Sequence, residues 1–244
     1  MKRYGLIGRT LKHSFSKTYF EKKFVEKGLA DSEYENFELK TIEEFPLLLQ
    51  SHPDLIGLNI TIPYKEEVMQ YLTEKNEIVE AIGACNCIKF EGGNAIGFNT
   101  DAIGFRKSLE PQLKTHHKKA LILGTGGASK AIRYTLTELG IEYRLVSRKK
   151  EENQCGYEDI GEEMLTDFHL IINTTPLGMY PAVDADPPVP YQYITSRHFL
   201  FDLIYNPAKT KFLAEGEKQG AQICNGYQML IEQAEESWRI WSEP

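Results

Sequence analysis

A glycine-rich turn within residues 119–129 is the stretch of this chain best suited to bind a ligand. The apolar run 119–123 is typical of a buried strand, and it leads through Gly124 and Gly126 into a helix-forming segment. Such a strand–turn–helix junction presents backbone N–H groups and the positive end of a helix dipole to a phosphate. Ser129 stands where a third glycine or alanine is usual, and its small side chain still lets the helix approach the strand.

The residues after this turn favour nucleotide binding over a tight turn without a ligand, an alternative that the glycines alone leave open. Apolar and small side chains follow at helical spacing, and Gly140 is a suitable residue to end the helix. The next predicted strand, 141–146, ends in the basic run 147–150 instead of the acid that binds ribose hydroxyls in NAD sites. Basic side chains suit a 2′-phosphate, so the sequence predicts an NADP site.

Lys65 and Asp101 are candidates for acid–base chemistry. Lys65 follows the strand-like run 55–61 and Pro63, which predicts that it lies in the first turn of a helix, where the dipole disfavours a cation. A lysine in that position is either a tunable functional amine or a solvated surface residue, and the sequence leaves both readings open. For Asp101, the pattern around it predicts that either Thr100 or Asp101 is a helix N-cap, which would give its carboxylate a structural use.

Other polar side chains lie at the ends of predicted elements. Ser14 and Ser16 are two residues apart, and one of them is expected to cap the first helix. Asn86 lies between two cysteines at the start of a strand, where a simple turn residue is the alternative. Tyr205 and Asn206 follow a strand, and ligands of open α/β sheets bind at the carboxyl ends of strands.

Strand and helix patterns alternate along the whole chain, which indicates an α/β protein with largely parallel sheets. A capping box of Thr41 and Glu44 predicts one helix start, and Asn206 with Pro207 predicts another. The polar segment 112–119 reads as a linker, and we place the change of domain near residue 101. The predicted strands are 3–8, 33–39, 55–61, 85–90, 95–98, 119–123, 141–146, 169–173, 199–204 and 221–224, and the predicted helices include 16–27, 42–50 and 227–241.

Composition excludes several classes of protein. The 244 residues, with 41% hydrophobic and 26% charged side chains, are ordinary for a globular enzyme. A net charge of −7 argues against nucleic acid or an anionic membrane as a partner. No apolar stretch approaches the ~20 residues that span a bilayer, and the first residues do not resemble a signal peptide. The cysteines fit neither a disulfide framework nor zinc spacing, so reduced thiols in the cytoplasm and no metal are expected.

A series of short motifs, in order along nearly the whole chain, resembles the shikimate dehydrogenase family. The matching segments are 13–16, 59–65, 83–86, 99–101, 124–129, 173–175, 202–207 and 226–234. The resemblance implies NADPH-dependent, reversible reduction of 3-dehydroshikimate to shikimate, a step of chorismate and aromatic amino acid biosynthesis. It also implies a two-domain α/β fold with a cleft between the domains. Residues 1–101, completed by the terminal helix 227–244, would be an α/β substrate lobe, and 102–226 a Rossmann-type NADP-binding domain.

The same resemblance assigns roles to individual residues. Lys65 and Asp101 would be the catalytic pair, with Lys65 exchanging a proton with the carbonyl oxygen of the substrate and Asp101 holding the amine in position. The substrate would be bound, beside Asp101, by Ser14, Ser16, Asn59, Thr61, Asn86 and Gln233, with Tyr205 close by. The cofactor would contact Gly124, Gly126, Gly127, Ala128, Ser129, Ser147, Arg148, Lys149, Thr174, Gly226 and Met229, with Lys150 able to assist.

The chain departs from the family pattern at several positions. Lys17, Cys87 and Ala102 replace the usual proline, threonine and glycine near the substrate residues, which leaves the polar contacts in place and puts fine specificity in doubt. The segment 147–149 replaces Asn-Arg-Thr but keeps Arg148, which would stack on adenine and bind the 2′-phosphate. The alternatives are a quinate/shikimate dehydrogenase that uses NAD, and a non-catalytic NADP-binding sensor. Only small molecules are expected as partners, for a monomer or homodimer.

Overall fold

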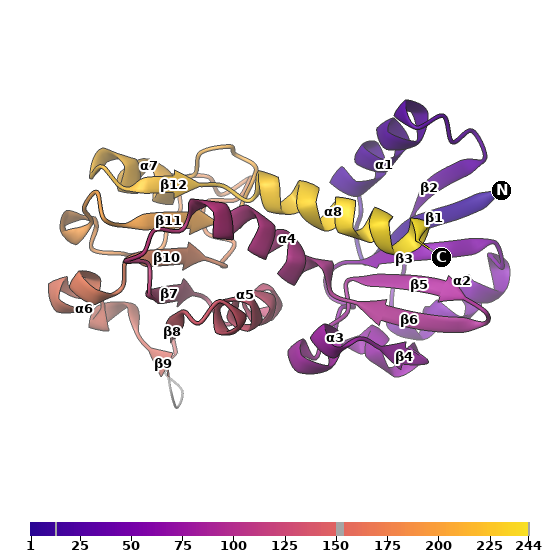
Figure 1. Ribbon diagram of the computed structural model, residues 1–244, viewed down its shortest axis with the longest axis horizontal. Coiled ribbons are helices and arrows are strands. Elements are labelled where there is room, and N and C mark those ends of the chain that lie inside the picture. Colours follow the sequence, from indigo (N-terminus) through magenta and orange to yellow (C-terminus); the bar gives the residue numbers. More distant parts are fainter. Residues whose placement is uncertain (13, 150–153, 244) are drawn as a thin grey trace. The chain divides into compact units, whose positions relative to one another are not determined.

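The computed structural model describes residues 1–12, 14–149 and 154–243 (Figure 1). Contacts within the chain divide it into two units, the first made of Met1–Asp101 with Gln233–Pro244 and the second of Ala102–Glu232. Each unit contains one six-stranded sheet with helices, which confirms the predicted α/β fold class. The chain passes from the first unit to the second within α4 (Thr100–Leu109) and returns within α8 (Tyr227–Ser242).

The sheet of the first unit combines parallel and antiparallel strands in the order β2-β1-β3-β5-β6-β4. Strands β2, β1 and β3 run parallel, whereas β3, β5 and β6 are antiparallel neighbours, and β4 adds to β6 in parallel. Strands β5 and β6 form a hairpin, joined by Gly92 and Gly93 with φ of 59° and 84°. The bounds are β1 Lys2–Gly8, β2 Ser32–Glu38, β3 Leu55–Ile60, β4 Glu74–Lys75, β5 Cys87–Glu91 and β6 Asn94–Phe98.

Each face of this sheet is covered by its own helices. On one face, α1 (Phe15–Glu26) and the end of α8 pack an aromatic core in which Trp241 lies directly on Gly57 of β3. A Cβ on Gly57 would lie 2.2 Å from the Trp241 indole nitrogen, so only glycine allows this contact. The other face packs α2 (Phe45–Ser51) and α3 (Glu77–Ile82), with the short 3-10 helices Ile42–Glu44 and Glu67–Tyr71 at its margin.

The second unit has a fully parallel sheet in the order β12-β11-β10-β7-β8-β9. Counted from β7, this is the strand order 3-2-1-4-5-6 of a Rossmann-type sheet, in which the direction of winding changes between β7 and β10. Ligands of such sheets bind at the carboxyl ends of the strands beside that point. The bounds are β7 Lys119–Leu123, β8 Glu142–Val146, β9 Gln154–Cys155, β10 Leu170–Asn173, β11 Phe199–Asp202 and β12 Gln222–Cys224.

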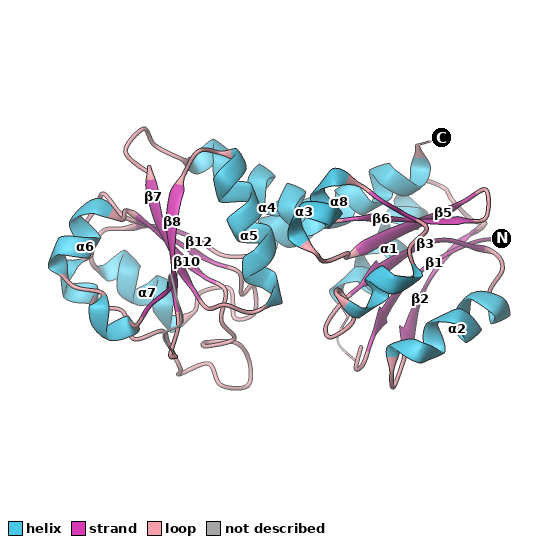
Figure 2. Cartoon of the chain, turned by 90° about the horizontal axis from the view of Figure 1, so that it is seen from below, coloured by secondary structure: helices cyan, strands magenta, loops and turns pink. Residues whose placement is uncertain are grey.

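Helices cover both faces of the parallel sheet, as Figure 2 shows with the sheet seen along its edge. α5 (Gly127–Glu138) and α4 cover one face, and α6 (Glu162–Asp167) and α7 (Lys211–Lys218) cover the other. Successive β7 side chains alternate between the two cores, Ala120 and Ile122 on the α5 side and Leu121 and Leu123 on the α7 side. Short 3-10 helices lie at Glu110–Gln112, Tyr157–Asp159 and Tyr191–Tyr193.

The predicted capping box of Thr41 and Glu44 is wrong in its contacts. A 3-10 helix does start after Thr41, but the Thr41 side chain makes no capping hydrogen bond. The Glu44 carboxylate instead accepts from the backbone N–H of Lys40 at 3.1 Å. No capping box forms, because Glu44 bonds to the backbone of Lys40, the residue before the N-cap, instead of to Thr41.

The predicted helix start at Asn206 and Pro207 is also wrong. Residues 203–210 form a loop, and α7 begins at Lys211 with Thr210 as its N-cap. The Thr210 hydroxyl accepts from Leu213 N and donates to Asp202 Oδ2 at 2.6 Å. A buried carboxylate at the end of β11 thus fixes the cap, and a local pattern could not reveal it.

Candidate active site

Lys65 and Asp101 form an ion pair in the first unit. Lys65 Nζ donates to Asp101 Oδ2 at 2.6 Å. The two side chains remain 27% and 19% exposed, so a small molecule can reach both. A charge-assisted hydrogen bond this short holds the ammonium in one place while leaving its other N–H groups available.

The backbone around Lys65 differs from the prediction. Residues 62–66 form turns rather than a first helical turn, and only the 3-10 helix Glu67–Tyr71 follows. The Lys65 carbonyl accepts from Cys85 N at 2.8 Å, while Met69 N bonds to Glu66. This contact to a distant segment takes the place of the helical bond, so Lys65 does not lie in a helical first turn where a dipole would disfavour its charge.

Asp101 lies within α4 rather than before it. The helix begins at Thr100, so neither Thr100 nor Asp101 is the N-cap that the sequence suggested. Asp101 is the acidic residue of the first turn, where the positive end of the helix favours a carboxylate. Its side chain pairs with Lys65 across a sequence separation of 36 residues, so the carboxylate is not occupied as a cap.

Asn86 and Thr100 bind each other beside this pair. The Asn86 Oδ1 atom accepts from Thr100 N at 2.6 Å, and Asn86 Nδ2 donates to Thr100 Oγ1 at 3.0 Å. Thr100 Oγ1 also lies 3.5 Å from Gln233 Oε1, which brings α8 to the same place. Asn86 and Gln233 are therefore brought together through Thr100, a residue that sequence reasoning considered only as a cap.

Asn59 at the end of β3 lies in a second part of the same network. Its Oδ1 accepts from the Tyr34 hydroxyl at 2.9 Å, and its Nδ2 donates to Ser237 Oγ at 2.9 Å. Tyr34 also hydrogen-bonds Ser16 near the start of α1, and burial holds the pKa of its phenol well above the usual value. Sequence reasoning did not single out Tyr34 or Ser237. The one signal that could have found Ser237 is its position four residues after Gln233, on the same face of α8.

The remaining predicted substrate residues are less closely tied together. Ser14 is the N-cap of α1, as expected for one of the two serines, and its hydroxyl accepts from Lys17 N. Thr61 follows β3 and is held through its backbone to Ile7. Tyr205 belongs to the second unit, in the loop after β11, and is 38% exposed.

The glycine turn of the second unit has the geometry that the sequence predicts. Gly124 follows β7 with a φ of 106°, and a Cβ there would meet the Thr174 hydroxyl at 2.9 Å. Gly126 faces open space, and Gly127 and Ala128, both exposed, begin α5. The first turn of α5, described throughout, contains no acidic side chain. Such a helix start presents free N–H groups to an anion.

Ser129 completes the turn from within the helix. It is buried, and its hydroxyl donates to Gly126 O at 2.6 Å, so the side chain stabilises the turn and packs helix against strand. The helix then ends as predicted, with Gly140 at a φ of 66°.

The end of β8 presents basic side chains to solvent. Arg148 and Lys149 are exposed, and Lys149 N donates to Ser147 Oγ at 3.3 Å. Lys150, which the sequence also suggested as a contact, lies outside the described residues. The described side chains at this strand end, Arg148 and Lys149, carry positive charge, which suits a phosphate ester.

The other predicted cofactor residues have structural partners of their own. Thr174 Oγ1 donates to Leu123 O at 2.8 Å and joins the carboxyl ends of β10 and β7. Gly226 precedes α8, and a Cβ on it would lie 2.0 Å from Leu203 O. Met229 packs on the core under α4 and α5.

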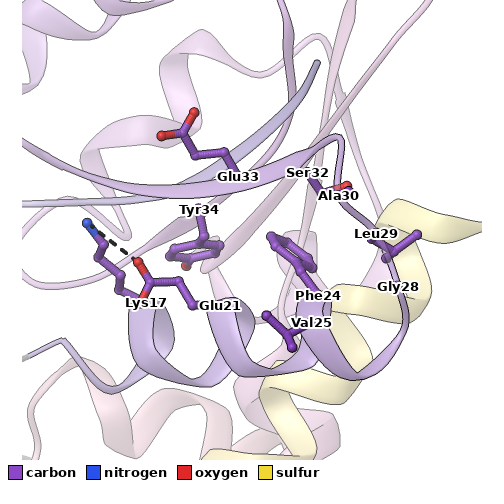
Figure 3. A pocket seen from close by; sticks show the side chains of 10 residues that line it. All are labelled: Lys17, Glu21, Phe24, Val25, Gly28, Leu29, Ala30, Ser32, Glu33 and Tyr34. Carbon is purple, nitrogen blue, oxygen red and sulfur yellow. Dashed lines mark ion pairs between the residues drawn. The ribbon is translucent and has the colours of Figure 1, made fainter.

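The depression drawn in Figure 3 lies elsewhere in the first unit. It has a volume of about 490 Å³ between α1 and β2, and its lining joins the Lys17–Glu21 ion pair to apolar residues such as Phe24 and Val25. Of the described residues that line it, none is a predicted site residue. Tyr34, whose ring lines this depression, contacts the network through the hydrogen bond of its hydroxyl to Asn59.

The described residues show no group of three or more histidine, cysteine, aspartate or glutamate side chains that could hold a metal. Among the helices described, none is both long and apolar enough to cross a membrane. Each cysteine is a free thiol. Burial raises the pKa of Cys85 to about 12 and that of Cys87 well above its ordinary value, which keeps both thiols protonated and unreactive.

Comparison with known proteins finds similarity to shikimate dehydrogenases over nearly the whole chain. Residues 6–88 match the family model described as the shikimate dehydrogenase substrate binding domain. A shikimate dehydrogenase (NADP(+)) of Caldicellulosiruptor saccharolyticus is 37% identical over 99% of this chain and 92% of its own length.

Solved structures agree with this. A crystal structure of shikimate dehydrogenase in complex with NADP+ is 34% identical, with a TM-score of 0.86 over 99% of this chain and 90% of its own. The Thermus thermophilus enzyme, in complex with NADP(H) and shikimate, is 28% identical, with a TM-score of 0.87 over 99% of this chain and 94% of its own.

The Rossmann-type sheet, the glycine turn and the lysine–aspartate pair define the class of the protein as a two-domain α/β oxidoreductase. Within that class, the chain belongs to the shikimate dehydrogenase family.

Proposed function

We propose that this chain catalyses the reversible, NADP-dependent reduction of 3-dehydroshikimate to shikimate in aromatic biosynthesis. Similarity to shikimate dehydrogenases over nearly the whole chain supports the reaction and the cofactor. The observation that carries the chemistry is the Lys65–Asp101 hydrogen bond of 2.6 Å between side chains that solvent reaches. A sensor that only binds nucleotide has no use for such a pair.

Lys65 is the proton donor and acceptor in this proposal. Its ammonium directs one N–H to Asp101 and can direct another to the carbonyl oxygen of the substrate. As that carbon is reduced, the oxygen gains negative charge, and a proton from Lys65 Nζ neutralises it. In the reverse direction the neutral amine takes the proton back. Asp101 limits the rotation of the lysine chain and can accept from the same substrate hydroxyl.

The first unit holds the substrate in this proposal. Ser14, Ser16, Asn59, Thr61, Asn86 and Gln233 all belong to it, and the contacts described above bring Asn59, Asn86 and Gln233 to one buried network. Carboxamide and hydroxyl groups suit a ring with several hydroxyls and a carboxylate. Tyr205, a residue of the second unit, is the remaining proposed substrate residue.

The second unit holds NADP in this proposal. The donor set fits the cofactor: open space at Gly126, the start of α5 without an acid in its first described turn, and exposed Arg148 and Lys149. The main chain at Gly124–Ser129 would bind the pyrophosphate, with Ser147, Arg148 and Lys149 around the 2′-phosphate. Thr174, Gly226 and Met229 would also contact the cofactor. The bound cofactor supplies the hydride.

The cysteines and the net charge support a cellular compartment and a class of ligand for the enzyme. Free cysteines suit a reducing compartment, so we place the enzyme in the cytoplasm. The net charge of −7 supports small molecules, rather than nucleic acid, as its ligands. We propose a monomer or homodimer.

The direct test mixes purified protein with shikimate and NADP and follows the absorbance of reduced nicotinamide. We expect steady formation of NADPH, with slower formation of NADH from NAD. No reduced nicotinamide with either cofactor, from shikimate or from quinate, would overturn the proposal. Faster turnover of quinate with NAD would instead support the quinate-oxidising alternative.

A further inference from the structure

Ser237 connects several of the proposed substrate residues, although it is not one of them. It is fully buried on α8, one helical turn after Gln233. Its hydroxyl donates to Gln233 O at 2.9 Å, accepts from Asn59 Nδ2 at 2.9 Å and lies 3.3 Å from Thr100 Oγ1. A single hydroxyl thus contacts α8, the end of β3 and the start of α4.

The direction of the Ser237 hydroxyl fixes the orientation of the Asn59 carboxamide. Because the Ser237 hydrogen points to Gln233 O, the oxygen can only accept from Asn59. The second partner on that side, Asn86 O at 3.4 Å, is a carbonyl and also only accepts. Both require the NH₂ group of Asn59 there, so Oδ1 must point the other way, to Tyr34.

The two asparagines then offer opposite groups to a ligand. Both Asn59 Nδ2 hydrogens are used within the protein, which leaves one lone pair on Oδ1 beside the Tyr34 contact. The Asn86 Oδ1 atom accepts from Thr100, and one Nδ2 hydrogen goes to Thr100 Oγ1, which leaves the other hydrogen. Asn59 can therefore only accept, and Asn86 can donate.

We infer that Ser237 is a positioning residue that sets this polarity: it holds Asn59 as an acceptor for one substrate hydroxyl while Asn86 donates to another oxygen. The inference rests on the proposed function. It makes Ser237 a determinant of specificity for a ring that presents a hydroxyl hydrogen to Asn59. Loss of the Ser237 acceptor leaves only the longer bond to Asn86 O, and the carboxamide of Asn59 can turn over.

The test compares Ser237→Ala with wild type on shikimate and on two analogues, each lacking one of the ring hydroxyls that are not oxidised. We expect Ser237→Ala to raise the KM for shikimate about fivefold with kcat within about twofold, the effect of one lost hydrogen bond. On the analogue that lacks the Asn59-paired hydroxyl, the same substitution should leave KM unchanged. Ser237→Cys, which fills the space with a poor acceptor, should behave like Ser237→Ala and serves if the alanine variant is unstable.

Ser242→Ala is the matched control. Ser242 lies on the same helix and donates to Trp238 O at 2.7 Å in the same way, but it is exposed and is the last residue of α8. The Ser242→Ala variant should have the same KM for shikimate as wild type. An unchanged shikimate KM in both Ser237 variants would overturn the inference, as would an equal rise for shikimate and both analogues, since that marks a purely structural role. A wild-type enzyme inactive on shikimate would instead overturn the proposed function.

Discussion

In the first unit, hydrogen bonds from neighbouring side chains hold the proposed substrate residues Asn59 and Asn86, whereas in the second unit the proposed cofactor site is built mainly from main chain. Asn59, Asn86 and Ser237 are all at least nine-tenths buried and hydrogen-bonded side chain to side chain. The turn at Gly124 and Gly126 offers backbone groups, and Arg148 beside it is exposed.

The difference has a chemical reason. A pyrophosphate presents the same oxygens in every nucleotide, so backbone N–H groups and a helix start suffice for it. A substituted ring must be told apart from its relatives by which hydroxyl donates and which accepts, and fixed side chains achieve this. Substitutions should therefore act on turnover and specificity in the first unit and on cofactor affinity in the second.

The largest effect is expected at Lys65. Lys65→Ala removes the proton donor, and general acid–base catalysis contributes about 10²–10⁴-fold, so we expect kcat to fall about 10³-fold with KM changed less than about tenfold. Steady-state kinetics with shikimate and NADP measure both. Lys75→Ala, at an exposed position on β4, is the control and should match wild type. A rise in KM at constant kcat would make Lys65 a binding residue only.

A smaller effect, confined to the cofactor, is expected at Arg148. Arg148→Ala removes a charged contact to the 2′-phosphate, so the KM for NADP should rise about 10–100-fold while that for NAD stays within about twofold. The control is Arg144→Ala, at an exposed arginine on β8, which should leave both values unchanged. An unaltered preference for NADP in Arg148→Ala would contradict the assignment.

The two units should also differ in their response to acid, because buried histidines gather at one edge of the second unit. His117 Nδ1 accepts from Lys114 N and its Nε2 faces Arg197 O, which requires a neutral ring. Burial lowers the pKa of His117 to about 4, and it lowers the pKa of His169 and of His198 as well. Lys114 and Arg197 add repulsion, whereas hydrogen bonds to the backbone and, at His169, the Asp167 carboxylate act to raise the pKa values.

These rings are neutral in the folded protein, whereas the unfolded chain takes up protons below about pH 6.5. Stability from this source is therefore complete above pH 6.5 and is lost as the pH falls toward 4. Burial raises the pKa of Asp202 to about 6, which acts in the opposite direction between about pH 4 and 6. Asp202 is present in both wild type and a histidine variant, so its contribution cancels when their Tm values are subtracted at each pH.

The smallest expected effect is a change in how steeply Tm falls with pH. His117→Asn should lower the Tm at pH 7, because one buried contact is lost, and should flatten the fall of Tm between pH 6.5 and 4. Hydrogen exchange at pH 5 should show residues 114–119 and 195–199 opening before the first unit. His52→Asn in the first unit is the control. Parallel Tm profiles for His117→Asn and wild type would refute the role of His117.

Local patterns predicted what depends on local geometry. The strand, glycine turn and helix around Gly124, the stop at Gly140 and the Ser14 cap are set by backbone conformation and nearest neighbours. The predictions for the backbone at Lys65 and for the start of α7 were wrong because partners outside the local pattern determine both. These partners are Cys85 N and the Asp202 carboxylate. Ser237 is 178 residues from Asn59, so no spacing rule could have joined them.

The return of the chain within α8 has a consequence for biosynthesis. The first unit is discontinuous, since Gln233–Pro244 belongs with Met1–Asp101. While the chain is on the ribosome, the Gly57 face of β3 stays without Trp241 until Trp241 itself has left the exit tunnel. The second unit has all its strands earlier and can fold first, although its sequence begins later. Helix α8 therefore completes the core of strands that are made long before it.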